Sequence, residues 1–186
     1  MQASAEIQKL TGGRAIDRIA FDEDRIARRV AELGAAIGAH YVTGDLLVIG
    51  LLKGSFVFLA DLIRTIPRPL HVDFVIAASY GASTTSSGRV QLLYQPEASV
   101  DGKHVLLVED IVDSGNTLNR LSQLFRGGNP RSLEICTLLQ KKSARLETPP
   151  RFIGFEAPDD FLVGYGLDHA EDFRHLPFIA TITQSS

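Results

Sequence analysis

The chain has 186 residues, of which 45% are hydrophobic and 22% are charged, and its formal net charge is -3. This size and apolar content predict one compact domain, and the acidic balance excludes a basic surface that would wrap a nucleic acid. No run of about 18 apolar residues occurs, which excludes a membrane-spanning helix. The first ten residues show neither a signal-peptide pattern nor an Arg-rich presequence, so we expect a cytoplasmic protein without a membrane or nucleic-acid partner.

Apolar runs of strand length alternate with stretches of helical period. An amphipathic helix is expected over residues 21–37, with Gly34 and Gly38 near its end. A second helix is expected over 56–63, before Pro67, and a third over 117–126. The predicted strands cover residues 46–50, 71–78, 89–94, 105–108 and 133–139. This alternation is typical of the α/β class, in which helices cover a mostly parallel central sheet.

Two segments depart from this alternation. Residues 79–88 are small and polar with little apolar surface to bury, and we expect a mobile loop there between two antiparallel strands. From Phe152 onward, short strands and loops are expected to form a small second lobe. The single cysteine, Cys136, lies in an apolar run and is interpreted as a structural residue.

The most informative stretch is 105–118, which reads Val-Leu-Leu-Val-Glu-Asp-Ile-Val-Asp-Ser-Gly-Asn-Thr-Leu. It combines a buried strand, an acidic turn and the start of a helix. Loops at the carboxyl ends of parallel strands bind ligands, and a helix amino terminus offers unpaired N–H groups to an anion. Ser114 to Thr117 can therefore hold a phosphate, with Gly115 allowing close approach. The Gly-Lys-Ser/Thr ending of a Walker loop is missing.

Three carboxylates, Glu109, Asp110 and Asp113, stand within five residues of one another. They would repel one another unless hydroxyl donors, a cation or a positive reaction centre compensated them. A sugar with vicinal hydroxyls together with Mg²⁺ would do so. An acidic turn in which Asp113 or Ser114 merely caps the helix would explain the cap, but not the Glu109-Asp110 pair.

Residues 108–117 resemble the phosphoribosyl pyrophosphate signature of the type I phosphoribosyltransferases, and the six-oxopurine branch is the closest match. The resemblance implies the type I fold, as a single domain over 1–186. A small hood over the base would form from the amino-terminal segment and about 152–186. The family pattern also implies a homodimer or a homotetramer.

The resemblance assigns roles to each residue of this signature. Glu109 and Asp110 would hold the ribose hydroxyls, directly or through magnesium. Asp113, Ser114, Gly115, Asn116 and Thr117 would bind the 5′-phosphate, and Asp113 would also accept a proton from the purine. Some relatives have lysine in place of Asn116, and backbone amides can still make that contact.

Other segments resemble the family's pyrophosphate site and its mobile loop. Leu-Leu-Lys-Gly-Ser at 51–55 matches the pyrophosphate loop, which implies a role for Lys53 and Gly54 and often a cis peptide at Lys53. Arg174 would clamp the pyrophosphate oxygens, because a guanidinium fork matches that geometry. Ser79-Tyr80 matches a mobile catalytic loop that closes over the reaction centre and excludes water.

The family's base-binding region resembles residues 155–168, together with a lysine after an earlier strand. Lys141 would donate to the oxygen at position six of the purine and so select oxopurines over adenine. Phe161 would stack on the base, and Leu162 would contribute main-chain groups. Asp168 would lie by the base, the magnesium and the pyrophosphate. The pattern assigns no role to His169 or His175, which we interpret as surface residues.

The implied reaction is purine salvage, in which phosphoribosyl pyrophosphate and a six-oxopurine base are the substrates. The phosphoribosyl group passes to N9 of hypoxanthine, and of guanine, giving IMP or GMP and pyrophosphate, with Mg²⁺ as cofactor. A xanthine-preferring or broad oxopurine enzyme is an alternative. A regulator that senses phosphoribosyl pyrophosphate and binds nucleic acid is a second, but such proteins usually add a basic face or a DNA-binding domain, and this acidic chain has space for neither.

Overall fold

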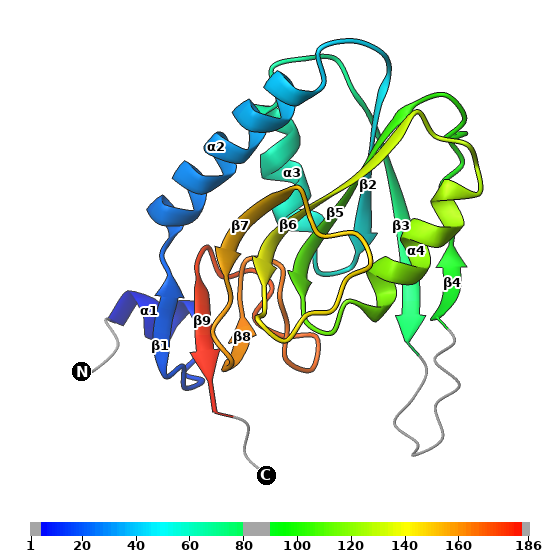
Figure 1. Cartoon of the computed structure of the whole chain (residues 1–186). Coiled ribbons are helices and arrows are strands. Elements are labelled where there is room, and N and C mark those ends of the chain that lie inside the picture. The colour runs from blue at the N-terminus through cyan, green and yellow to red at the C-terminus, as the bar shows by residue number, and fades with distance from the viewer. Residues whose placement is uncertain (1–4, 80–89, 184–186) are drawn as a thin grey trace.

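The computed structural model describes residues 5–79 and 90–183, which form two β-sheets with helices packed against them (Figure 1). The larger sheet consists of β2 (Leu46–Leu52), β3 (His71–Ser79), β4 (Val90–Tyr94), β5 (His104–Val112), β6 (Ser132–Gln140) and β7 (Phe152–Glu156). The strand order is β4-β3-β2-β5-β6-β7, and all neighbours are parallel except β3 and β4. The fold is therefore α/β with a mostly parallel central sheet, as the sequence predicts.

Helices cover both faces of this sheet. Two of them, α2 (Glu23–His40) and α3 (Phe56–Thr65), pack on one face, and α4 (Asn116–Arg126) packs on the other. Because successive side chains of a strand point to opposite faces, Leu106 enters the core under α2 and α3, whereas Leu107 enters the core under α4. β5 is thus buried on both faces, which explains its continuous apolar run.

α2 continues past the two glycines that were expected near its end. It runs to His40, and a Cβ atom at Gly34 would lie 2.0 Å from Oγ1 of Thr65 in α3. A Cβ atom at Gly38 would lie 2.6 Å from Cδ of Pro67. These glycines therefore let α2 pack closely against α3 and the residues after it, and they do not end the helix.

A smaller sheet forms a second lobe from the two ends of the chain. It contains β1 (Arg18–Phe21), β8 (Phe161–Val163) and β9 (Ile179–Ile182), which are antiparallel in the order β1-β9-β8. The short helix α1 (Ala5–Leu10) contributes Ile7 to the core of this lobe. The lobe therefore joins segments that are far apart in the sequence.

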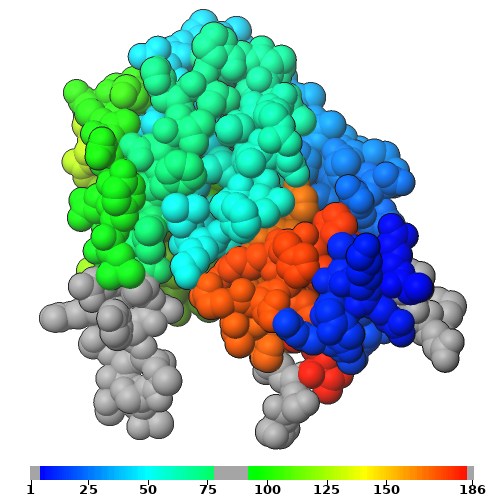
Figure 2. Space-filling view, turned by 180° about the vertical axis from the view of Figure 1, so that it is seen from behind, coloured from blue at the N-terminus to red at the C-terminus, as the bar shows by residue number. Residues whose placement is uncertain are grey.

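β7 lies in the larger sheet, so the second lobe begins later than the expected boundary at about residue 152. β7 pairs with β6, and Phe152 is buried in the core that α2 covers. Figure 2 shows that the carboxyl-terminal segment, in orange, lies against the cyan segment that follows β2. Within the two described ranges, no helix is long and apolar enough to cross a membrane.

Candidate active site

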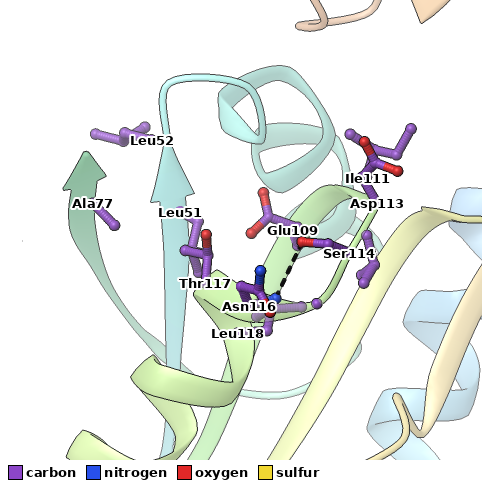
Figure 3. Close-up of a pocket in the computed structure, with 12 residues that line it drawn as sticks. Leu51, Leu52, Ala77, Glu109, Ile111, Asp113, Ser114, Asn116, Thr117 and Leu118 are labelled. Atoms are coloured by element: carbon purple, nitrogen blue, oxygen red, sulfur yellow. Dashed lines mark hydrogen bonds between the residues drawn. The ribbon is translucent and has the colours of Figure 1, made fainter. Parts of the chain in front are cut away.

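The turn after β5 lines a cavity of about 220 Å³ at the carboxyl edge of the sheet. Ser114, Gly115, Asn116 and Thr117 contribute to its wall, together with Glu109 of β5 (Figure 3). α4 begins at this cavity, and the first N–H groups of a helix have no partner within the helix, so they are suited to bind an anion. The structure thus gathers the residues that the sequence assigns to the 5′-phosphate.

Gly115 is required by both its backbone angle and its neighbours. Its φ is 89°, in the left-handed region, and a Cβ atom there would lie 2.6 Å from the carbonyl oxygen of Arg145. The Arg145 N–H donates to the Ser114 carbonyl at 3.0 Å. Asn119 of α4 donates from Nδ2 to the Arg145 carbonyl at 3.0 Å and accepts from the Glu147 N–H at 2.9 Å. The segment after β6 therefore holds the turn of residues 113–117, which we call the phosphate turn, through backbone contacts.

The two carboxylates of the acidic pair have different neighbours. Glu109 lines the cavity, whereas Asp110 is 7% exposed and lies under Gly54, where a Cβ atom would be 1.9 Å from Oδ2 of Asp110. Burial raises the pKa of Glu109, and the neighbouring charge of Asp110 raises it further. Among the described residues, no lysine or arginine forms an ion pair with either carboxylate. This pair is therefore suited to hydroxyl donors and a cation.

Asp113 and Lys141 meet across the ends of β5 and β6. Nζ of Lys141 lies 3.3 Å from Oδ1 of Asp113, and the Lys141 N–H donates to the Val112 carbonyl at 3.0 Å. The Asp113 side chain is 68% exposed, whereas that of Lys141 is 20% exposed. The carboxylate is therefore open to a ligand, with a largely covered cation beside it.

The loop after β2 meets the carboxyl-terminal segment next to Asp110. The Leu52–Lys53 peptide bond is cis, as the family resemblance implied. A Cβ atom at Gly166 would lie 2.2 Å from the carbonyl oxygen of Gly54. Gly54 is therefore enclosed between Asp110 of β5 and Gly166, which follows β8, and only a glycine fits there.

Arg174 is fixed beside this loop by three oxygen atoms. Its Nη1 donates to the Gly166 carbonyl at 2.8 Å, and its Nη2 lies 2.8 Å from Oδ1 of Asp168 and 3.5 Å from Oε2 of Glu171. The same Oε2 lies 3.0 Å from Nζ of Lys53. The structure therefore brings Lys53, Gly54, Asp168 and Arg174 together. Within residues 5–79 and 90–183, no group of three or more acidic, His or Cys side chains could hold a metal ion, so Glu109, Asp110 and Asp168 form no joint ligand set.

The residues assigned to the base lie on β8 and beside it. Phe161 is 38% exposed, and the centroid of its ring is 5.5 Å from that of His169 in an edge-on arrangement. Leu162 is 6% exposed, and its main chain is paired with Thr181 of β9. Phe161 is therefore partly exposed, and Leu162 is buried in the smaller sheet.

Sequence reasoning missed several contacts of this site. It gave no role to His169, which lies against Phe161, or to Glu171, which joins Lys53 and Arg174. Glu171 and Lys53 are 118 positions apart, so no local pattern could reveal their pairing. Of the expected mobile-loop dipeptide, Ser79 ends β3, and Tyr80 lies outside the described residues.

Known proteins match the chain over most of its length. The family model of the phosphoribosyl transferase domain matches residues 20–170. A hypoxanthine-guanine phosphoribosyltransferase of Bacillus subtilis is 45% identical over 90% of this chain and 93% of its own. A hypoxanthine phosphoribosyltransferase of Salmonella typhimurium is 44% identical over 86% of this chain and 92% of its own.

Solved structures agree with these matches. A crystal structure of a hypoxanthine-guanine phosphoribosyltransferase from Bacillus anthracis superposes with a TM-score of 0.86 at 42% identity, over 91% of this chain and 100% of that one. One of a hypoxanthine phosphoribosyltransferase from Staphylococcus aureus gives a TM-score of 0.88 at 34% identity, over 98% of this chain and 97% of that one. The chain therefore belongs to the phosphoribosyltransferase family, among its hypoxanthine and hypoxanthine-guanine phosphoribosyltransferases.

Proposed function

We propose that the protein transfers the phosphoribosyl group of phosphoribosyl pyrophosphate to N9 of hypoxanthine, and of guanine, in purine salvage. The products are IMP or GMP and pyrophosphate. The observation that carries the proposal is the meeting of the phosphate turn, the acidic pair and the cis-peptide loop at one edge of the sheet. Relatives at 44% and 45% identity are a hypoxanthine and a hypoxanthine-guanine phosphoribosyltransferase, which supports the choice of base.

The substrate would lie across three groups of residues. The 5′-phosphate would bind the turn of residues 113–117, and the ribose hydroxyls would lie by Glu109 and Asp110. The pyrophosphate would lie by Lys53, Gly54 and Arg174, where two cations would contact its oxygens. Mg²⁺ would offset the charge that develops on the leaving pyrophosphate. Because Glu109, Asp110 and Asp168 form no joint ligand set, the Glu109-Asp110 pair and Asp168 would contact such an ion separately, and substrate and water oxygens would supply its other ligands.

Asp113 and Lys141 present complementary groups to one edge of an oxopurine. On that edge the oxygen at position six is next to N7. Lys141 would donate to the oxygen, while Asp113, 3.3 Å away, would accept the N7 proton as N9 attacks C1 of the ribose. Adenine presents an amino group where hypoxanthine presents the oxygen, so it would leave Lys141 without an acceptor. Phe161 would stack on the base, and the main chain of Leu162 would contact its edge.

Parallel assays with hypoxanthine, guanine, xanthine and adenine test this function. With phosphoribosyl pyrophosphate and Mg²⁺, we expect nucleotide formation from hypoxanthine and guanine but not from adenine. Asp113→Asn keeps the shape of the side chain but removes the proton acceptor, so kcat should fall by about 10²–10⁴-fold. A folded protein that binds phosphoribosyl pyrophosphate but turns over no base would overturn the assignment, and turnover of xanthine alone would overturn the choice of base.

A homodimer or homotetramer and a cytoplasmic location are also part of the proposal. A dimer or a tetramer has the closed symmetry that most soluble oligomers show. Light scattering at the concentration used in the assays would give the number of subunits. A monomer with full activity would contradict the oligomer. Fractionation of the producing cells would locate the protein, and recovery with membranes or medium would contradict the cytoplasmic location.

A further inference from the structure

Glu171 occupies the space between the two cations assigned to pyrophosphate. Its Oε2 lies 3.0 Å from Nζ of Lys53 and 3.5 Å from Nη2 of Arg174. A single carboxylate oxygen thus contacts both cations, as an oxygen of a bound anion would. The pKa of Glu171 is consistent with this contact. The Lys53 ammonium lowers that pKa most, the Arg174 guanidinium lowers it less, and the carboxylate stays ionised.

The turn that carries Glu171 is fixed by its main chain. His169 and Asp172 exchange both backbone hydrogen bonds, at 3.3 Å and 3.1 Å, and the Glu171 N–H donates to Oδ2 of Asp168 at 2.9 Å. Ala170 and Glu171, at the tip, have φ angles of 53° and 67°, in the left-handed region that side chains other than glycine adopt rarely. The turn is therefore specifically shaped, and it directs the Glu171 side chain toward Lys53.

The charges of the four side chains that meet at this point cancel one another. Lys53 and Arg174 contribute two positive charges, and Asp168 and Glu171 contribute two negative charges in direct contact with them. A site for a polyanion would gain affinity from a net positive charge. Asp168 has a role in the proposed reaction, whereas Glu171 has none. Glu171 is therefore the group that lowers the positive charge of this site without serving the chemistry.

We propose that Glu171 is an affinity-determining residue that competes with the pyrophosphate group for Lys53 and Arg174. The inference rests on the proposed function, which assigns these two cations to pyrophosphate. The carboxylate would leave the cations when phosphoribosyl pyrophosphate binds and return to them when pyrophosphate departs. Because the Glu171 backbone is tied to Asp168 and its side chain is 67% exposed, this exchange needs only a side-chain rotation. Glu171 would thereby weaken substrate binding and assist product release.

Glu171→Gln tests the competition, because it keeps the size of the side chain and removes its charge. Ion pairs of an exposed carboxylate contribute little each, and Glu171 is exposed although Arg174 is largely covered, so loss of the two contacts should tighten binding of magnesium pyrophosphate by about three- to tenfold. Isothermal titration calorimetry measures this dissociation constant directly. The KM for phosphoribosyl pyrophosphate should fall by a similar factor, while the KM for hypoxanthine should not change. The gain should shrink at high salt, because screening weakens exposed charges.

Glu156→Gln is a matched control. Oε1 of Glu156 lies 3.0 Å from Nζ of Lys142, the same distance as in the Lys53–Glu171 pair, and the side chains of both pairs are similarly exposed, at 74% and 66% against 66% and 67%. This control makes the same change in net charge away from the pyrophosphate residues, so it should leave pyrophosphate affinity unchanged.

Two results would overturn the inference. Unchanged or weaker pyrophosphate binding by Glu171→Gln, in a protein that still forms nucleotide, would remove the competition and leave the proposed function intact. An equal gain in Glu156→Gln would assign the effect to net charge alone. If the unaltered chain neither bound pyrophosphate nor formed nucleotide, the proposed function would fail as well, and the activity assay separates that case from the other two.

Discussion

The phosphate turn and the pyrophosphate region meet at the same edge of the sheet, but they are built differently. The turn is one contiguous segment, residues 113–117, and backbone groups hold it, since Arg145 contacts it through its own N–H and carbonyl. The pyrophosphate region joins the loop after β2 to the turn at 168–174 through side-chain ion pairs. Backbone contacts fix one geometry, whereas exposed ion pairs can exchange partners. The first region is therefore suited to hold an anion throughout a reaction, and the second to release one.

Gly115→Ala should break the first region with the largest effect. The new methyl group would lie 2.6 Å from the Arg145 carbonyl, and the φ of 89° is unfavourable for any side chain. We expect the free energy of unfolding to fall by roughly 2–4 kcal/mol and kcat/KM for phosphoribosyl pyrophosphate to fall by at least about 100-fold, because the turn would shift. Thermal denaturation and steady-state kinetics measure these changes.

Gly102→Ala separates backbone strain from the contact. Gly102 also has a positive φ, 67°, but nothing lies within 4 Å of a Cβ atom there. In this control the free energy of unfolding should fall by only about 1–2 kcal/mol, and the activity should not change. If both variants lost stability equally and kept activity, the contact with Arg145 would not support the turn.

The sequence predicts the phosphate turn, which is one contiguous segment, far better than the pyrophosphate region, which is assembled from distant segments. The signature at 108–117 joins strand, turn and helix in one run, so local chemistry defines most of that site. The apolar runs of β2 and β5 likewise predict central strands, because burial on both faces removes alternation. The family pattern assigned Arg174 to pyrophosphate, but only the fold shows that Glu171 is beside it and Lys53.

The errors have a common physical cause in tertiary packing. Gly34 and Gly38 were expected near the end of the helix, which lies at His40, but the close approach to Thr65 explains why Gly34 stands inside α2. β1 and α1 were not predicted, because β1 has four residues and acquires its partner only from β9, more than 150 positions later. Elements that depend on distant partners carry little local signal.

Asn119→Ala should loosen the turn without displacing it, an effect of intermediate size. The amide of Asn119 holds the carbonyl of Arg145 and the N–H of Glu147, so the variant loses two hydrogen bonds behind the turn. We expect a loss of about 1–2 kcal/mol in unfolding free energy and a rise of about three- to tenfold in the KM for phosphoribosyl pyrophosphate. The KM for hypoxanthine should stay within twofold, which a general loss of structure would not allow.

Gln123→Ala is the control on the same helix. The Gln123 side chain donates to both carboxylate oxygens of Glu147, at 3.1 Å, and among the described residues it forms no hydrogen bond with a backbone group of the segment after β6. It should leave both KM values unchanged. An equal rise in the KM for phosphoribosyl pyrophosphate in both variants would mean that the segment after β6 acts as a whole, rather than through the backbone contacts of Asn119.

His169→Ala should give the smallest effect, and it tests whether the assembled region extends to the base. His169 lies on the turn that carries Glu171, and its ring meets the edge of Phe161 at a centroid distance of 5.5 Å. An aromatic contact of this kind contributes about 0.5–1.5 kcal/mol, so loss of the ring should raise the KM for hypoxanthine by about two- to tenfold by freeing Phe161. The KM for phosphoribosyl pyrophosphate should not change. His175→Ala, which removes a ring whose Nε2 contacts the Leu10 carbonyl at 2.9 Å, should change neither KM. If His169→Ala instead raised the KM for phosphoribosyl pyrophosphate, the turn would serve the pyrophosphate alone, and the orientation of Phe161 would depend on β8.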